Sequence, residues 1–227
     1  MLKVKEIFKS LNGECNAFGQ GSVSTFIRLA GCNLNCSYCD VERRDDGVDV
    51  TITSILSRIK TNIVTITGGE PFLQRDQLQN LISALLTRKN KIVIETNGSL
   101  PLLLYSESIR KDQLCYVIDY KSKQNFNVDV KYFTKYDYIK FVVKDLIELE
   151  SNLKEIEYIH RTNPYINIAV SSVMRENFNF SAGMELNDIS RSYINLIPPQ
   201  KLFDFLIEFN LDYILYNVQL HKYLKMR

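Results

Sequence analysis

The sequence predicts an α/β fold, a partial, open TIM-like barrel of about six mostly parallel strands with crossover helices. Two observations carry this prediction. Apolar runs of strand length alternate along the chain with segments whose apolar residues recur at helical spacing. Polar or glycine-containing motifs follow several of the runs directly, as expected where parallel strands bring their carboxyl ends to one face. The 227 residues suit one domain, residues 1–227, with a sizeable core.

The predicted strands are short runs rich in branched and aromatic residues, bounded by polar or glycine-containing turns. Their separation by helices favours a parallel sheet with crossover connections. They cover residues 4–8, 23–29, 63–67, 91–96, 115–119, 138–143, 166–170 and 213–218.

The predicted helices lie between these strands. Residues 50–60 carry isoleucine and leucine on one face, and Thr51 or Thr53 is available as the cap. Further helices are predicted over residues 74–88, 145–159 and 201–209. The stretch 171–196 has a poorer pattern, so we expect loop and irregular structure there.

The composition excludes several classes of protein. The net charge is +2 with charges mixed along the chain, which argues against a nucleic-acid partner. No apolar run is long enough for a signal peptide or a membrane span, so we expect a cytoplasmic protein that does not bind membranes. Five cysteines, an odd number and clustered, fit a reducing compartment.

Cys32, Cys36 and Cys39 form a C-x3-C-x2-C motif directly after the second predicted strand. A closed structural zinc site or a fully ligated iron–sulfur cluster takes four protein ligands. Three thiolates can instead hold three irons of a four-iron cluster and leave the fourth iron open to a substrate or cofactor. The motif therefore predicts a [4Fe-4S] cluster with one open position.

Other interpretations of these cysteines are weaker. A disulfide framework would require a secreted protein. A zinc site would need a fourth ligand, and no candidate has the second paired spacing of zinc-binding motifs. The candidates for that fourth ligand are Cys15, Cys115, His160 and His221.

A second motif, Thr67-Gly68-Gly69-Glu70-Pro71, follows a predicted buried strand. Alone, it would be interpreted as an ordinary turn between strand and helix. Together with the cysteines, and with Tyr38 just before the last of them, it resembles the radical S-adenosylmethionine (SAM) enzymes, whose cluster binds SAM through the open iron. The resemblance implies a [4Fe-4S] cluster and SAM as cofactors, with a 5′-deoxyadenosyl radical as the reactive species.

The same resemblance implies which residues surround SAM. Gly68 and Gly69 would let backbone groups approach the methionyl amine, and Glu70 could accept a hydrogen bond from it. Asp119 and Lys121 could equally form a simple ion pair at a strand end. A bulky residue at Gly69 is expected to spare the cluster and abolish SAM cleavage. The implied SAM-binding residues are Ser37, Tyr38, Gly68, Gly69, Glu70, Asp119, Tyr120 and Lys121.

The order of motifs along nearly the whole chain is similar to that of the 7-carboxy-7-deazaguanine synthase family. The segments near the two ends discriminate, since other radical SAM families share the cysteines and the glycine pair. The resemblance is carried by residues 6–14, 26–32, 67–71, 119–122 with 139–143, and 218–222.

This family resemblance implies a lyase of deazapurine and queuosine biosynthesis, which converts 6-carboxy-5,6,7,8-tetrahydropterin to 7-carboxy-7-deazaguanine with loss of ammonia. It also implies magnesium, a flavodoxin or ferredoxin as electron donor, a homodimer, and no catalytic side chain beyond the cluster and SAM. Glu14 would accept from the amino and ring N–H edge of the pterin, and Arg28 would pair with its carboxylate. Glu14 could otherwise be a solvated loop charge, and Arg28 a surface residue. The implied substrate-binding residues are Leu11, Asn12, Gly13, Glu14, Arg28 and Thr67.

Several positions depart from the family pattern. Val41 stands where the family commonly has a Thr or Ser that helps to hold magnesium, so Asp40, substrate and water would have to hold the ion. Asn12 replaces a frequent glutamine and Cys15 a glycine, so the substrate pocket is expected to differ in detail. Residues 122–124 replace an expected proline-containing continuation on the SAM side.

Two other functions remain open on the sequence alone. A glycyl-radical enzyme activase would share the cluster and SAM but act on a protein partner through a large docking surface. A non-catalytic metal or iron–sulfur module predicts no SAM affinity and no use for the glycine pair. His221, near the end of the chain, would either close the site or simply pack there.

Overall fold

The computed structural model describes residues 1–39, 46–179 and 190–224, and a nine-stranded sheet forms its centre. The strands are β1 (Leu2–Leu11), β2 (Val23–Leu29), β3 (Val48–Val50), β4 (Ile63–Gly68), β5 (Lys91–Thr96), β6 (Leu114–Tyr120), β7 (Tyr138–Val143), β8 (Asn167–Ser172) and β11 (Ile214–Tyr216). The helices are α1 (Ile52–Arg58), α2 (Arg75–Thr87), α3 (Glu107–Asp112), α4 (Leu146–Thr162), α5 (Pro199–Glu208) and α6 (Leu220–Tyr223), with 3-10 turns at Pro71–Gln74, Lys123–Asn125 and Val130–Tyr132.

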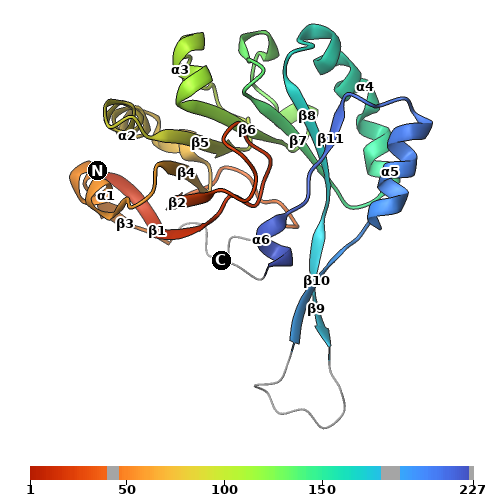
Figure 1. The fold of residues 1–227 in the computed structure, drawn as a ribbon, viewed down its shortest axis with the longest axis horizontal. Coiled ribbons are helices and arrows are strands. Elements are labelled where there is room, and N and C mark those ends of the chain that lie inside the picture. The colour runs from red at the N-terminus through yellow and green to blue at the C-terminus, as the bar shows by residue number, and fades with distance from the viewer. Residues whose placement is uncertain (40–45, 180–189, 225–227) are drawn as a thin grey trace.

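The sheet has the strand order β11-β8-β7-β6-β5-β4-β2-β1-β3. Every pairing from β2 to β11 is parallel, and the sheet curves without closing, with α1 to α5 along its outer side (Figure 1). This confirms the predicted partial α/β barrel with mostly parallel strands. The sheet is wider than the expected six strands.

The apolar periodicity seen in the sequence packs the helices against the sheet. Leu78, Leu81 and Leu85 recur along α2 and are fully buried, while Ile94 and Ile118 are buried in β5 and β6. Strands covered on both faces contain nearly continuous apolar runs, which is why these were recognisable. The hydroxyl of Thr51 accepts a hydrogen bond from the Ser54 N–H at 3.2 Å, which selects Thr51 over Thr53 as the cap of α1.

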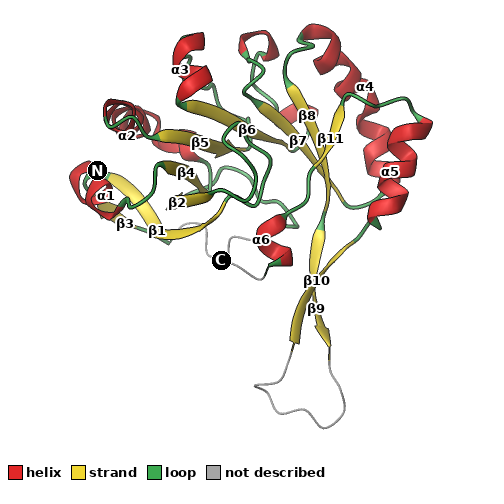
Figure 2. Cartoon of the chain, viewed as in Figure 1, coloured by secondary structure: helices red, strands yellow, loops and turns green. Residues whose placement is uncertain are grey.

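Two predictions about the elements were wrong. The first strand is longer than residues 4–8 and is antiparallel to β2, because residues 12–22, which join the two strands, contain turns and no crossover helix. Loop and irregular structure was predicted for residues 171–196, but the described parts of this range, 171–179 and 190–196, consist mostly of strands. There, β8 continues to Ser172, and β9 (Met174–Asn179) and β10 (Ser190–Asn195) form an antiparallel pair that projects from the barrel (Figure 2).

The physical reason for the missed hairpin is its polar composition. The segment Met174–Asn179 reads MRENFN, so it lacks the apolar alternation that marks a half-buried strand. Backbone pairing holds it in place, from Ser190 opposite Asn179 to Asn195 opposite Met174. The helix α3 was also not predicted, since six residues are too short to show a helical period.

The parallel register brings the carboxyl ends of the strands to one edge, as the sequence predicted. Arg28 of β2 lies opposite Thr67 of β4, and Asp119 of β6 lies opposite Lys140 of β7. The cysteine loop, which contains Cys32, Cys36 and Cys39, follows β2 at this same edge. The motifs that carry chemistry therefore converge, although they are far apart in the chain.

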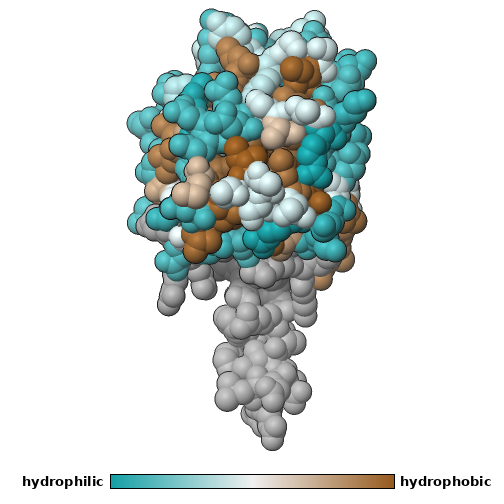
Figure 3. Space-filling model, turned by 90° about the vertical axis from the view of Figure 1, so that its left-hand side faces the viewer, coloured by the Kyte–Doolittle hydropathy of each residue, from teal (hydrophilic) through white to brown (hydrophobic). Residues whose placement is uncertain are grey.

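The end of the strand order at β3, near α1, presents a surface of mixed hydrophilic and hydrophobic side chains, with the hydrophobic ones gathered near its centre (Figure 3). Met1 and Val48 are 71% and 69% exposed at this end. In the part of the chain that the structure describes, no helix is long and apolar enough to cross a membrane.

A buried ion pair beneath the sheet yields a stability prediction. Arg110 and Asp137 are bonded with side chains 2% and 0% exposed, and Asp137 also accepts from the Tyr116 and Thr134 N–H groups. Removing one partner leaves the other charge buried and unpaired. We expect Asp137→Ala to lower the free energy of unfolding by about 3 kcal/mol, as measured by denaturant titration.

The exposed pair of Lys131 and Asp129 provides the control. Lys131→Ala should leave the denaturation midpoint nearly unchanged, because solvent screens exposed ion pairs and because Asp129 keeps its hydrogen bond to the backbone of the next turn. A small effect of Asp137→Ala, similar to that control, would show that the buried pair does not hold α3 against β6 and β7.

Candidate active site

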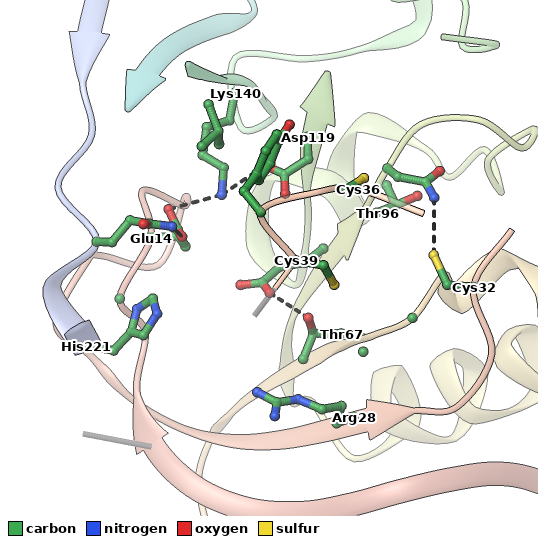
Figure 4. A pocket seen from close by; sticks show the side chains of 18 of the residues that line it. Glu14, Arg28, Cys32, Cys36, Cys39, Thr67, Thr96, Asp119, Lys140 and His221 are labelled. Carbon is green, nitrogen blue, oxygen red and sulfur yellow. Dashed lines mark hydrogen bonds and ion pairs between the residues drawn. The ribbon is translucent and has the colours of Figure 1, made fainter. Parts of the chain in front are cut away.

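A cavity of about 190 Å³ opens at the carboxyl edge of the sheet (Figure 4). Its wall comes from β1, β2, β4, β5, β6, β7 and β9, from the loops after β1 and β2, and from α6. Both charged groups and apolar side chains line it, so the cavity can receive a ligand that is itself part polar and part apolar.

The cysteines of the loop after β2 line one side of this cavity. Asn97 at the end of β5 directs its side-chain amide toward the Cys32 sulfur at 3.9 Å. Burial raises the pKa of the Cys36 thiol, and the nearby Lys121 ammonium opposes that rise. Among the described residues, no three His, Cys, Asp or Glu side chains converge closely enough for a single metal ion. A four-iron cluster makes a different demand, because each thiolate binds a separate iron.

The glycine pair after β4 packs directly against the start of the cysteine loop. A Cβ at Gly69 would lie 1.7 Å from the Gly31 carbonyl oxygen, and one at Gly68 would lie 2.2 Å from the Leu29 carbonyl oxygen. The Gly69 N–H donates to Leu29 at 3.0 Å and the Glu70 N–H to Gly31 at 2.7 Å. Only glycine permits this approach, which fixes the strand end against the loop that carries Cys32.

This packing corrects one expectation from the sequence. A bulky residue at Gly69 was predicted to spare the cluster, but its side chain would displace Gly31, the residue before Cys32. Substitution at Gly69 therefore affects the cysteine loop as well as the cavity.

Glu70 lies behind the glycine pair and not in the cavity wall. Its carboxylate accepts from the Phe72 and Asn97 N–H groups and from the Thr96 hydroxyl, at 2.8–3.0 Å. Burial raises its pKa, while these hydrogen bonds oppose the rise. Glu70 thus ties the end of β5 to the turn after β4, and positions backbone that does face the cavity.

Glu14 is a buried carboxylate held from three directions. Its Oε1 accepts from Gln219 at 3.0 Å, and its Oε2 accepts from Asn217 at 2.5 Å and pairs with Lys140 at 3.1 Å. Burial alone would raise the pKa of Glu14, but the Lys140 ammonium holds it below its usual value. Glu14 is therefore ionised and fixed in orientation, which excludes the interpretation as a solvated loop charge.

Asp119 and Lys121 face the cavity together at the end of β6. Their ion pair measures 3.2 Å, and the Lys121 ammonium lies 5.0 Å from the centre of the Tyr38 ring in the cysteine loop. Despite burial, the neighbouring Lys121 and Lys140 ammonium groups lower the pKa of Asp119 to about 2. The ion pair expected from the simpler interpretation thus exists and lies in the cavity wall.

Arg28 projects from β2 into the cavity beside aromatic side chains. Its guanidinium pairs with Glu6 at 2.7 Å and lies 5.2 Å from the centre of the Phe8 ring, which stacks on Phe26. The Arg28 side chain remains 25% exposed, so part of this cation can meet an anionic ligand.

The family model that matches this chain is the radical SAM superfamily, over residues 26–174. A 7-carboxy-7-deazaguanine synthase from Clostridium acetobutylicum is 39% identical over 207 residues, which cover 83% of this chain and 91% of that protein. The chain belongs to the 7-carboxy-7-deazaguanine synthase family. A relative of the same name from Koribacter versatilis is 28% identical over 98% of this chain and 96% of its own length.

The fold of the chain is similar to a crystal structure of QueE from Escherichia coli. The TM-score is 0.60 at 20% identity, covering 75% of this chain and 83% of that one. This likeness supports the open barrel described above.

Proteins of the radical SAM superfamily hold a [4Fe-4S] cluster and SAM, and the cavity of this family member fits both. Cys32, Cys36 and Cys39 supply three thiols to one side of the cavity. The glycine pair presents backbone without side chains beside them. Asp119 and Lys121 offer charges that complement an amino-acid group and hydrogen-bonding atoms that suit ribose hydroxyls.

Most of the predicted site residues lie in the cavity wall of this synthase-family chain. Four of the described ones do not. Asn12 is buried in a hydrogen-bond network with Ser22 and Thr65, and Ser37 is exposed. Tyr120 packs on Phe141 and Phe126, and Glu70 lies behind the glycine pair. The magnesium candidate Asp40, with Val41, lies outside the described residues. The predicted residues in the wall are Leu11, Gly13, Glu14, Arg28, Cys32, Cys36, Tyr38, Cys39, Thr67, Gly68, Gly69, Asp119 and Lys121.

Sequence reasoning missed Lys140, Glu95, Asn217 and Gln219 as site residues. A lysine and a glutamate inside apolar strands are unusual, and this was the available signal. No local pattern marks Asn217 or Gln219, which reach Glu14 from the C-terminal segment. His221 lines the cavity and packs tightly on Gly13, where a Cβ would lie 1.8 Å from Nδ1.

Glu95 gives a pH-dependent stability prediction. It accepts from the Thr67 hydroxyl at 2.7 Å, and burial raises its pKa from 4.5 to about 7, with Lys140 opposing. The folded state keeps this proton while the unfolded state loses it, so the contribution of Glu95 to stability falls as the pH rises through that interval. We expect Glu95→Gln, which cannot ionise, to become more stable than wild type by on the order of 3 kcal/mol above about pH 8, with no such advantage near pH 4.

The measurement is the free energy of unfolding of both proteins across this pH range. Taking the difference between them cancels the other titrating groups. Parallel curves would show that Glu95 ionises normally in the folded protein.

Proposed function

We propose that this chain is a 7-carboxy-7-deazaguanine synthase, a radical SAM lyase that converts 6-carboxy-5,6,7,8-tetrahydropterin to 7-carboxy-7-deazaguanine and ammonia. The observation that carries the proposal is that Glu14 and Arg28 line the same cavity as the three cysteines. The pterin has an edge of N–H donors and a carboxylate, so it needs an ionised acceptor and a cation. The agreement of relatives in name over most of the chain supports the same substrate.

The side chains of this protein bind and orient the ligands. Glu14 accepts from the amino and ring N–H groups of the pterin, and Arg28 pairs with its carboxylate. The Thr67 hydroxyl donates its proton to Glu95 and can accept a hydrogen bond from the pterin. Leu11 and Gly13 pack along the ring, and Asn12 supports them from behind. The bound cluster and SAM supply the radical that removes hydrogen from the substrate.

The SAM side of the cavity is assigned by the same logic. Gly68 and Gly69 present backbone to the methionyl group, with Ser37 and Tyr38 in the adjacent loop. Asp119 and Lys121 orient polar groups of SAM, Tyr120 packs behind them, and Glu70 holds the glycine turn.

Further parts of the proposal concern partners. Magnesium would be held by Asp40, the substrate and water, since Val41 cannot ligate a metal. The electron would come from a flavodoxin or ferredoxin, and the active form would be a homodimer acting in the cytoplasm. The product would enter deazapurine biosynthesis, including that of queuosine.

An anaerobic assay tests this function. The cluster-loaded protein receives reductant, SAM and 6-carboxytetrahydropterin, with and without magnesium, and mass spectrometry detects 7-carboxy-7-deazaguanine. Product is the expected result, and product without added magnesium would show that the ion is dispensable in a chain with Val41. Formation of 5′-deoxyadenosine alone would make the pterin the wrong substrate, and no SAM cleavage at all would overturn the enzyme assignment.

A further inference from the structure

Lys140 joins the two sides of the cavity, and neither the sequence motifs nor the family resemblance assigns it a role in binding. It projects from β7 with a side chain only 6% exposed. Its ammonium pairs with Glu14 Oε2 at 3.1 Å and with Asp119 Oδ1 at 2.9 Å (Figure 4). A single buried cation thus serves two carboxylates from different parts of the chain.

The contacts continue on both sides of Lys140. The second oxygen of Asp119, Oδ2, pairs with the Lys121 ammonium. That ammonium lies over the ring of Tyr38 in the cysteine loop. On the other side, the Glu14 carboxylate accepts hydrogen bonds from Asn217 and Gln219 of the C-terminal segment. A continuous series of charged and polar contacts therefore runs from the cysteine loop to Asn217 and Gln219, with Lys140 at its centre.

The charges explain why the cation is needed. Glu14 faces Lys140 from β7, Asp119 from β6, Glu95 from β5 and His221 from α6. Two of these neighbours are carboxyl groups, so an ionised Glu14 would be disfavoured without a cation in contact. The carboxylates in turn raise the pKa of Lys140 well above its usual value, which keeps it charged.

We propose that Lys140 is a positioning residue that keeps Glu14 ionised and oriented to receive the pterin. This inference rests on the proposed function, because it is Glu14 that meets the substrate. Lys140 acts through Glu14 and needs no contact with the ligand. The Lys140 ammonium also pairs with Asp119, so it contacts the SAM side of the cavity as well.

The test is the pH dependence of ligand affinity in Lys140→Met. The probe is 6-carboxypterin, the unreactive oxidised form, titrated into anaerobic cluster-loaded protein by calorimetry. Without Lys140, the buried Glu14 carboxylate faces the half-buried Asp119 carboxylate with no cation between them, so Glu14 takes up a proton and loses its ability to accept from the pterin edge. We expect affinity on the order of 100-fold below that of wild type near pH 6, with the ratio between the two proteins narrowing as the pH rises. Comparing the proteins at each pH cancels the ionisation of Glu95, which both retain.

Two further variants separate positioning from a merely structural role. Lys123→Met removes an exposed lysine that pairs with Glu155 away from the cavity, so it should leave pterin affinity unchanged. Asp119→Asn added to Lys140→Met removes the competing negative charge and should restore part of the affinity near pH 6. A structural defect would not be repaired by a second substitution.

The outcomes are distinguishable. If the wild type does not bind 6-carboxypterin, the proposed function fails. If the wild type binds and Lys140→Met binds equally at every pH, or if Asp119→Asn gives no recovery, the role of Lys140 is overturned. Should Lys140→Met fail to fold, Lys140→Gln keeps a hydrogen-bond donor in place and is expected to show the same direction of change.

Discussion

Gly69→Ala is expected to abolish product formation and to lower cluster content at the same time. The added Cβ would lie 1.7 Å from the Gly31 carbonyl oxygen and 3.0 Å from the Cys32 nitrogen, so backbone must move. Overpacking of this kind costs up to about 3 kcal/mol. A displacement near 1 Å in a site that positions two ligands lowers the rate by on the order of 100-fold or more.

The measurement combines iron content and visible absorption of the reconstituted protein with the anaerobic assay. Gly19→Ala is the control, since Gly19 has a positive φ of 98° but no atom within 4 Å of the place that a Cβ would take. It should lose some stability from backbone strain and retain its cluster. Full cluster content in Gly69→Ala with loss of SAM cleavage alone would contradict the packing described here.

The parts of the site that the sequence predicted are those encoded by short motifs. The three cysteines and the glycine pair lie within single loops, so their spacing alone carried the chemistry. The parallel-strand rule then placed Asp119 and Thr67 at the same edge as Arg28, which the register confirms. Local pattern and topology together were enough for these residues.

The residues that sequence reasoning missed depend on contacts across long chain separations. Asn217 reaches Glu14 across 203 residues, and Lys140 completes an ion pair between segments that share no motif. A lysine in an apolar strand signals an unusual environment, but its partners follow only from the folded sheet. The roles of Asn12, Tyr120 and Glu70 differ from expectation for the converse reason, since motif membership does not show which way a side chain points.

Glu14→Gln is expected to lower kcat/KM for the pterin by on the order of 1,000-fold while cluster content and SAM binding stay at wild-type levels. The substitution keeps the size of the side chain but removes the negative charge, and it can direct an NH₂ donor at the donor edge of the pterin. Lys140 retains Asp119 as a partner, so the SAM side keeps its ion pairs.

Steady-state rates from the anaerobic assay, with SAM affinity from calorimetry, measure this effect. Gln219→Ala is the matched variant, because it removes one donor to Glu14 and leaves the carboxylate and Lys140 in place. Its loss should be about 10- to 100-fold, since one hydrogen bond to a charged group contributes roughly 1.5–3 kcal/mol. Equal losses in the two variants would indicate that the orientation of Glu14, and not its charge, determines substrate binding; unchanged kinetics in Glu14→Gln would remove Glu14 from the substrate site.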